Sequence, residues 1–126
     1  MEIREGRLLT RVGLKGKRFR VFEDALIDTG AAFTVIPPVV SDFLELETNR
    51  ALPKAMLVTA SGLIEAPIKI LEMLEVSGIE VERLSVVIHK IPDPAPIKVL
   101  LGMNFIEKIK ITINGKAGKF DLKDPL

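Results

Sequence analysis

The stretch that decides the fold is Ala25-Leu26-Ile27-Asp28-Thr29-Gly30-Ala31, in which an acid ends an apolar run and glycine follows two residues later. Leu26 and Ile27 are typical of the end of a buried strand. Gly30 permits a sharp turn directly after that strand, because glycine adopts backbone angles that are costly for larger residues. A carboxylate that emerges from a buried strand loses hydration, so it needs hydrogen-bond donors, a partner carboxyl or protonation. The stretch is therefore a candidate site.

The tripeptide by itself has a simpler explanation. Asp-Thr-Gly is a common turn sequence, and it occurs by chance in roughly one chain of this length in twenty. On its own it favours a plain turn over a catalytic site. The apolar residues on both sides of it, from Ala25 to Pro37, change that balance.

Two segments of the chain carry a resemblance to a known family. Ala25–Pro37 resembles the active-site segment of aspartic proteases, where apolar residues precede Asp-Thr-Gly-Ala and a short apolar strand follows. Farther along, Val99–Ile106 resembles the second signature of the retropepsin-like (retroviral-type) branch. In that signature an apolar pair and a glycine, here Leu100, Leu101 and Gly102, precede a short helix.

The resemblance extends over most of Arg18–Lys110 and implies an all-β fold, a retropepsin-like closed β-barrel with one or two short helices. Apolar alternation and turn residues agree and predict strands at Ile3–Leu14, Arg18–Ile27, Phe33–Ile36, Pro53–Thr59, Leu63–Leu71, Leu71–Val76, Ile79–Ile88, Val99–Leu101, Ile109–Ile113 and Ala117–Leu122. Short helices are predicted at Val39–Leu46 and Met103–Lys108. Turns are predicted at Gly13–Lys17 and, as a two-residue hairpin, at Asn114-Gly115.

Length and composition narrow the function classes. The length of 126 residues predicts a single domain, 1–126. Hydrophobic residues make up 48% of the chain and aromatic residues only 5%, which predicts an aliphatic core. A net charge of +1 indicates neither a nucleic-acid surface nor a basic membrane patch. With no cysteine and one histidine, His89, we expect no metal and no cofactor. No run reaches the ~18 apolar residues of a membrane helix and no signal peptide is recognisable, so we expect a soluble cytoplasmic protein with no membrane partner.

An enzyme that hydrolyses peptides with acidic side chains needs two neighbouring carboxyl groups. One is ionised and takes a proton from water, and the other is protonated and polarises the scissile carbonyl. The chain contains one Asp-[Thr/Ser]-Gly, so the resemblance implies a homodimer in which Asp28 of each subunit meets on the two-fold axis. It also implies that Thr29 bonds across to the other subunit and that Gly30 lets the backbone approach a peptide substrate. Ala31 and Ala32 would keep the floor of the cleft small.

A further hairpin is predicted around Thr59, Ala60, Ser61 and Gly62. The corresponding hairpin of the family is a flap that closes over bound peptide, which would pair with it by strand addition. The residues expected to make the side-chain pockets apolar are Leu26, Val35, Leu63, Ile64 and Pro92–Pro96. An ordinary surface hairpin is the alternative interpretation.

The chain departs from the viral pattern at two positions. Viral members often carry Asp after Asp-Thr-Gly-Ala and a pairing Arg after the second glycine, and Ala32 and Met103 stand there in this chain. Because both charges are absent together, neither is left unpaired. The main prediction is a homodimeric aspartic endopeptidase. Two alternatives stay open: a retropepsin-like module that dimerises or binds peptides without cutting them, and a small scaffold in which Asp28 only caps a turn.

Overall fold

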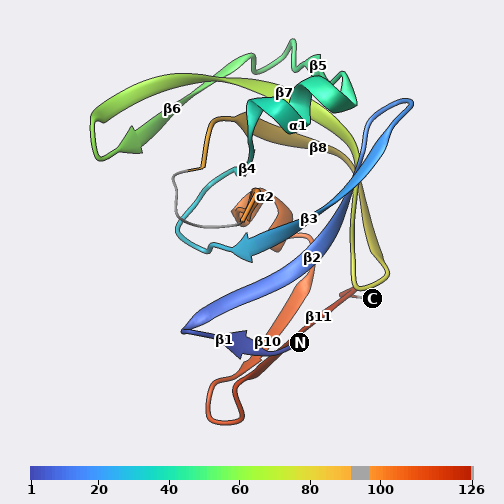
Figure 1. Cartoon of the computed structure of the whole chain (residues 1–126), viewed down its shortest axis with the longest axis vertical. Coiled ribbons are helices and arrows are strands. Elements are labelled where there is room, and N and C mark those ends of the chain that lie inside the picture. Colours follow the sequence, from blue (N-terminus) through green and yellow to red (C-terminus); the bar gives the residue numbers. More distant parts are fainter. Residues whose placement is uncertain (92–96, 126) are drawn as a thin grey trace.

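The computed structural model describes residues 1–91 and 97–125 and consists mainly of strands (Figure 1). The strands are β1 (Ile3–Arg4), β2 (Arg7–Lys15), β3 (Arg20–Ile27), β4 (Thr34–Ile36), β5 (Glu47–Thr48), β6 (Lys54–Thr59), β7 (Gly62–Val76), β8 (Ile79–Ile88), β9 (Val99–Leu101), β10 (Lys110–Asn114) and β11 (Lys119–Lys123). In the described part of the chain the helices are α1 (Pro38–Leu44) and α2 (Met103–Ile106). The prediction of an all-β fold with short helices is confirmed. The pocket predicted at Pro92–Pro96 lies outside the described residues.

Six strands pair in a closed circuit. β2 pairs with β3 on one side and with β7 on the other, and the path between these two runs through β9, β4 and β8. The pairs β3–β9 and β4–β8 are parallel, and the others in the circuit are antiparallel. Parallel neighbours cannot be joined by a tight hairpin, so they bring segments far apart in the sequence side by side. The ends of β3 and β9, which carry the two signature motifs, become neighbours in this way.

The core inside the circuit is aliphatic, as the composition predicts. It contains buried leucine, isoleucine and valine side chains from β2, β7 and β8 together with Ile36 and Leu101. Its largest fully buried side chain is Phe105 of α2, which anchors the segment after β9. A smaller cluster, Val35, Ala66, Ile68 and Val87, joins β4 to the β6–β7 hairpin. Removal of this apolar surface from water is the main stabilising contribution to the fold.

The C-terminal hairpin covers one end of the core. Phe120 and Leu122 of β11 are buried in the main cluster, while the alternate side chains of the strand are exposed. The N-terminus lies along β11, where Phe120 N–H donates to the carbonyl of Met1 and Ile3 N–H donates to that of Gly118. The N-terminal residues and β11 therefore lie side by side at this end of the core (Figure 1).

Several predicted turns and boundaries are wrong by a few residues. Asn114 pairs with Lys119, so the last hairpin has a four-residue turn and not a two-residue one; the Asn114 side chain accepts from Ala117 N–H, and Gly118 takes the positive φ of 68°. The first predicted strand is broken at Glu5 and Gly6, which both have positive φ. The two strands predicted on either side of Leu71 are the single strand β7.

The predicted helices are too long at their C-terminal ends. α1 ends at Leu44 because Glu45 turns left-handed, with φ 55°, and its N–H donates back to Asp42 and Ser41. This αL residue closes the last turn and stops the helix before Leu46. α2 ends at Ile106, where Glu107 leaves the α-helix. No helix in the described residues is long and apolar enough to cross a membrane.

The turn between β2 and β3 is fastened to the end of α1. The predicted turn at Gly13–Lys17 lies slightly too early, because β2 continues to Lys15 and the turn begins at Gly16. A Cβ atom on Gly16 would lie 2.3 Å from the carbonyl oxygen of Leu44, so only glycine fits there. Beside it, Arg18 makes two hydrogen bonds to the Glu45 carboxylate, at 2.5 and 2.6 Å.

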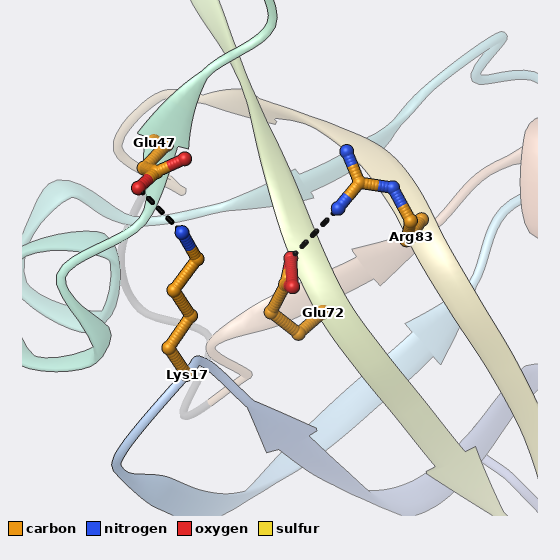
Figure 2. Close-up of polar contacts among 4 residues, drawn as sticks. All are labelled: Lys17, Glu47, Glu72 and Arg83. Atoms are coloured by element: carbon orange, nitrogen blue, oxygen red, sulfur yellow. Dashed lines mark hydrogen bonds and ion pairs between the residues drawn. The ribbon is translucent and has the colours of Figure 1, made fainter.

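Exposed ion pairs continue this contact across the sheet, as Figure 2 shows. Lys17 Nζ lies 2.7 Å from the Glu47 carboxylate on β5, and Arg83 of β8 lies 3.4 Å from Glu72 of β7. Exposed pairs of this kind contribute little to stability because water and salt screen them. The Lys17–Glu47 pair adds to the packing of the β2–β3 turn without replacing it.

Candidate active site

Asp28 is the first residue after β3 and is held by its own backbone and by β9. Its N–H donates to the carbonyl of Leu101 at 2.9 Å, which continues the parallel register of the two strands past Ile27. Its Oδ1 accepts a hydrogen bond from Gly30 N–H at 2.9 Å, and its carbonyl accepts from Ala31 N–H at 3.2 Å. The carboxylate is therefore held in place on the first residue of a tight turn.

The turn is partly open to solvent. Asp28 is half-buried, and Thr29 and Gly30 are exposed. The sequence predicted a desolvated carboxylate, and the described chain by itself removes only part of its water. Of the strand end predicted to be buried, Ile27 is buried, at 6% exposed, and Leu26 is half-buried. The active-site residues predicted at 28–31 thus form one turn at the end of β3, in which Thr29 and Gly30 are exposed and Asp28 and Ala31 are half-buried.

The second signature lies against the back of this turn. Leu101 is fully buried in β9, and Gly102 begins α2 in extended conformation. A Cβ atom on Gly102 would lie 2.3 Å from the carbonyl oxygen of Phe33 and 2.9 Å from that of Ala31. Glycine is needed there for close backbone approach. The predicted second-signature residues are therefore structural supports of the acid-bearing turn.

The backbone of α2 completes the support. Met103 N–H donates to the Ala31 carbonyl at 2.7 Å, and Asn104 N–H donates to the Ala32 carbonyl at 3.0 Å. Ala32 and Met103 are the positions where viral members carry a charge pair. In this chain the two segments are joined through backbone hydrogen bonds at these positions.

Sequence reasoning missed two polar residues beside the site. Thr34 of β4 is fully buried, and its hydroxyl accepts from Gly102 N–H at 3.2 Å. Asn104 Oδ1 accepts from Thr34 N–H at 2.8 Å and from the Thr34 hydroxyl at 3.0 Å. The available signal was a threonine inside the apolar run Phe33–Ile36, since a buried hydroxyl requires a partner.

The predicted flap is a two-stranded hairpin with a closed tip. Thr59 pairs with Gly62 around Ala60 and Ser61. The Thr59 hydroxyl donates to the Gly62 carbonyl at 2.9 Å and accepts from Ser61 N–H at 3.2 Å. Gly62 has a φ of 108°, which favours glycine. These contacts give the tip a defined shape.

The two faces of the hairpin differ. Leu57 and Ile64 are directly opposite each other in the register, and Leu57 packs against the cluster that contains Val35. Leu63 lies on the other face and is 66% exposed, as is Val58 at 86%. The sequence grouped Leu63 with Ile64 as pocket residues, but the two side chains do not share one face, because neighbours in a strand point to opposite faces. Leu57, which the sequence reading omitted, shares the face of Ile64.

The remaining predicted pocket residues lie at the strand ends near Asp28. Val35 is 8% exposed and pairs with Leu100, which packs against the same small cluster, and Leu26 is half-buried.

The single histidine, His89, is half-buried just after β8, where its backbone N–H donates to the carbonyl of Ile36. Among the described residues no group of three or more His, Asp or Glu side chains is placed to hold a metal ion.

Comparisons with known proteins agree with this geometry. The family described as "gag-polyprotein putative aspartyl protease" matches residues 11–108. Among solved structures, the chain is similar to a retropepsin-like aspartic protease from Rickettsia conorii, with a TM-score of 0.66 and 19% sequence identity over 98% of this chain and 85% of that one. A search of curated protein sequences finds no matching relative.

Proposed function

The chain belongs to the retropepsin-like family of gag-polyprotein aspartyl proteases, and from this premise we propose that it is an aspartic endopeptidase that acts as a homodimer. The observation that carries the proposal is the placement of Asp28. Its carboxylate is fixed by Gly30 N–H on an exposed turn, and the turn is supported from behind by Gly102. A side chain that only capped a turn would not require this second layer of support.

One such carboxylate is half of an acid dyad. In the proposed dimer the exposed turns of two subunits meet, and the two Asp28 carboxyls share one proton because like charges at short range do not both ionise. The ionised member takes a proton from a water molecule, and the resulting hydroxide attacks the scissile carbonyl. The protonated member donates its proton to the carbonyl oxygen. The first carboxyl, which now holds the proton taken from water, passes that proton to the leaving nitrogen as the C–N bond breaks. The hydroxyl formed from the carbonyl oxygen returns its proton to the second carboxylate, which restores the pair with one shared proton.

The proposed substrate is an extended peptide with apolar side chains near the cleaved bond. Leu57 and Ile64 on one face of the β6–β7 hairpin and the cluster around Val35 and Leu100 provide apolar surface. Peptide bound by strand addition presents alternate side chains to such surfaces. The hairpin with its tip at Thr59–Gly62 takes the role of the flap.

The first test compares cleavage of a diverse peptide library by the wild type and by Asp28→Asn. The substitution changes side-chain volume little and removes the ionisable group, so we expect hydrolysis to be lost while the fold and the dimer are retained. Light scattering should give a mass of about twice 13.9 kDa. Residual activity near that of the wild type, or an active monomer, would contradict the shared-dyad proposal. Peptide binding without cleavage would favour a silent binding module.

The pH profile separates an enzyme from a binding module. A proton-sharing pair works only when singly ionised, so the rate should follow a bell with one limb for each ionisation of the pair. Ala31 and Ala32 offer no side-chain donor to the anion, so we expect an optimum in the mildly acidic range. A rate that rises steadily to alkaline pH, or that a metal chelator stops, would assign the chemistry to other groups.

A further inference from the structure

The side chain of Asn104 joins three elements behind the acid-bearing turn. Its Oδ1 accepts from Thr34 N–H at 2.8 Å and from the Thr34 hydroxyl at 3.0 Å, which ties α2 to β4. Its Nδ2 donates to the Ser85 carbonyl at 2.7 Å, which ties α2 to β8. Both ends of one amide are therefore engaged.

The directions of these hydrogen bonds are determined by their partners. A backbone N–H only donates and a carbonyl only accepts, so the oxygen of the Asn104 amide faces Thr34 and its nitrogen faces Ser85. The Thr34 hydroxyl gives its proton to Asn104, and its oxygen accepts from Gly102 N–H at 3.2 Å. Thr34 is 0% exposed, so water cannot replace a lost partner.

This series of hydrogen bonds ends beside the turn that carries Asp28. Gly102 directly follows Leu101, whose carbonyl accepts from Asp28 N–H at 2.9 Å. The next two N–H groups, at the start of α2, hold the far side of the same turn through the carbonyls of Ala31 and Ala32. A shift of Gly102 would therefore move both sides of the turn together.

We propose that Thr34 and Asn104 are positioning residues for Asp28. They do not touch the reacting atoms, and they act through Gly102 and Leu101 to set where the Asp28 carboxyl lies relative to that of the second subunit. The inference rests on the proposed function, because it assigns a role in the same dyad. A displacement of about 1 Å can lower an enzymatic rate by about 10²-fold. A greater separation of the two carboxyls also weakens their coupling, which brings the two ionisations closer together.

Thr34→Val tests this directly, because valine has nearly the shape of threonine and lacks the hydroxyl. It leaves Gly102 N–H without its acceptor. We expect kcat to fall by about 10²-fold with KM little changed, and the pH bell to become narrower. Thr34→Ser keeps the hydroxyl and should restore both kcat and the width of the bell. Asn104→Asp places an oxygen against the Ser85 carbonyl and should act in the same direction as Thr34→Val.

Asn49→Ala is the matched control. Asn49 Nδ2 donates to the Ser85 hydroxyl at 2.9 Å, and its Oδ1 accepts from the N–H groups of Ala51 and Leu52. Its loss removes polar contacts to the same residue of β8, at a place with no hydrogen bond to Gly102. We expect a decrease in stability, with kcat per folded dimer and the pH bell unchanged.

The outcomes separate this inference from the proposed function. If the wild type does not hydrolyse peptides, or if Asp28→Asn hydrolyses them equally well, the proposed function is wrong. A ¹³C NMR titration of the Asp28 carboxyl, assigned from Asp28→Asn, then still tests positioning, because only Thr34→Val and Asn104→Asp should alter it. An unchanged kcat, bell and titration in Thr34→Val would overturn the inference, as would equal changes in Asn49→Ala.

Discussion

The turn after β3 and the turn after β9 each contain a glycine, and the surroundings of these two glycines differ. β3 is followed by Asp28 and Gly30, and its parallel neighbour β9 is followed by Gly102. A Cβ atom on Gly30 would meet only the Asp28 Oδ1, at 3.2 Å, whereas one on Gly102 would lie 2.3 Å from the carbonyl oxygen of Phe33. The turn after β3, the open turn, carries the acid, and the turn after β9, the packed turn, lies directly behind it.

The largest difference is expected from the same substitution in both turns. Gly102→Ala forces a methyl group against backbone atoms that cannot move aside cheaply, and should destabilise the fold by roughly 3 kcal/mol or more. Gly30→Ala should leave the free energy of unfolding nearly unchanged and should lower the rate of hydrolysis by restricting substrate approach. Chemical denaturation of both variants measures the difference.

Gly16→Ala is a control for the first of these effects. Gly16 has an equally close backbone neighbour, the Leu44 carbonyl, and lies at the opposite end of β3 from Asp28. Gly16→Ala should destabilise the fold to a similar degree and should leave the rate of hydrolysis per folded dimer unchanged. Equal stability of Gly102→Ala and Gly30→Ala would show that the two turns do not differ in the way described.

Much of the open turn could be predicted from the sequence, because its signals are local. The apolar run before Asp28 and the glycine after it define a strand end and a turn without any knowledge of distant residues. The packed turn could be identified only as a motif at Leu100–Gly102. Its role depends on the parallel pairs β3–β9 and β4–β8, which strand periodicity does not predict.

The hydrogen bonds between Thr34 and Asn104 could not be predicted from the sequence for the same reason, since 70 positions separate these residues. Local signals also failed where two turn types compete. Asn114-Gly115 favours a two-residue hairpin, but the left-handed position falls at Gly118 because the Asn114 side chain stabilises a wider turn. Residues whose conformation is set by contacts made elsewhere are the ones that the sequence misplaces.

An intermediate effect is expected at Thr29, the exposed residue of the open turn. In the proposed dimer its hydroxyl bonds across the two-fold axis, so Thr29→Val should weaken the dimer by about 1–3 kcal/mol for each orphaned partner. Thr29→Ser keeps the hydroxyl and should be nearly silent. Sedimentation over a range of concentrations measures the dissociation constant. An unchanged constant in Thr29→Val would mean that the hydroxyl faces solvent in the dimer, in contrast to the buried hydroxyl of Thr34.

The smallest effect is expected far from both turns, at the exposed pair Lys17–Glu47 (Figure 2). The hydrogen bond from Lys17, and then its charge, lowers the pKa of the Glu47 carboxyl below its usual value. The same contact, again with the hydrogen bond as the larger cause, raises the pKa of the Lys17 ammonium above its usual value.

The sign of the pH dependence follows from these directions. A carboxyl with a lowered pKa stabilises the folded state above its unfolded value and loses that contribution as the pH falls through the folded value. The lysine loses its contribution only as the pH rises through its raised pKa. The stability difference between the wild type and Glu47→Gln should therefore be small and constant through neutral pH. It should begin to shrink near pH 4, the ordinary pKa of glutamate, and vanish once the pH is below the lowered pKa of Glu47. High salt should reduce it at neutral pH. A difference that persists or grows in acid would mean that Glu47 acts through packing and not through its charge. The exposed pair would then resemble the packed turn at Gly102 in the way it stabilises the fold.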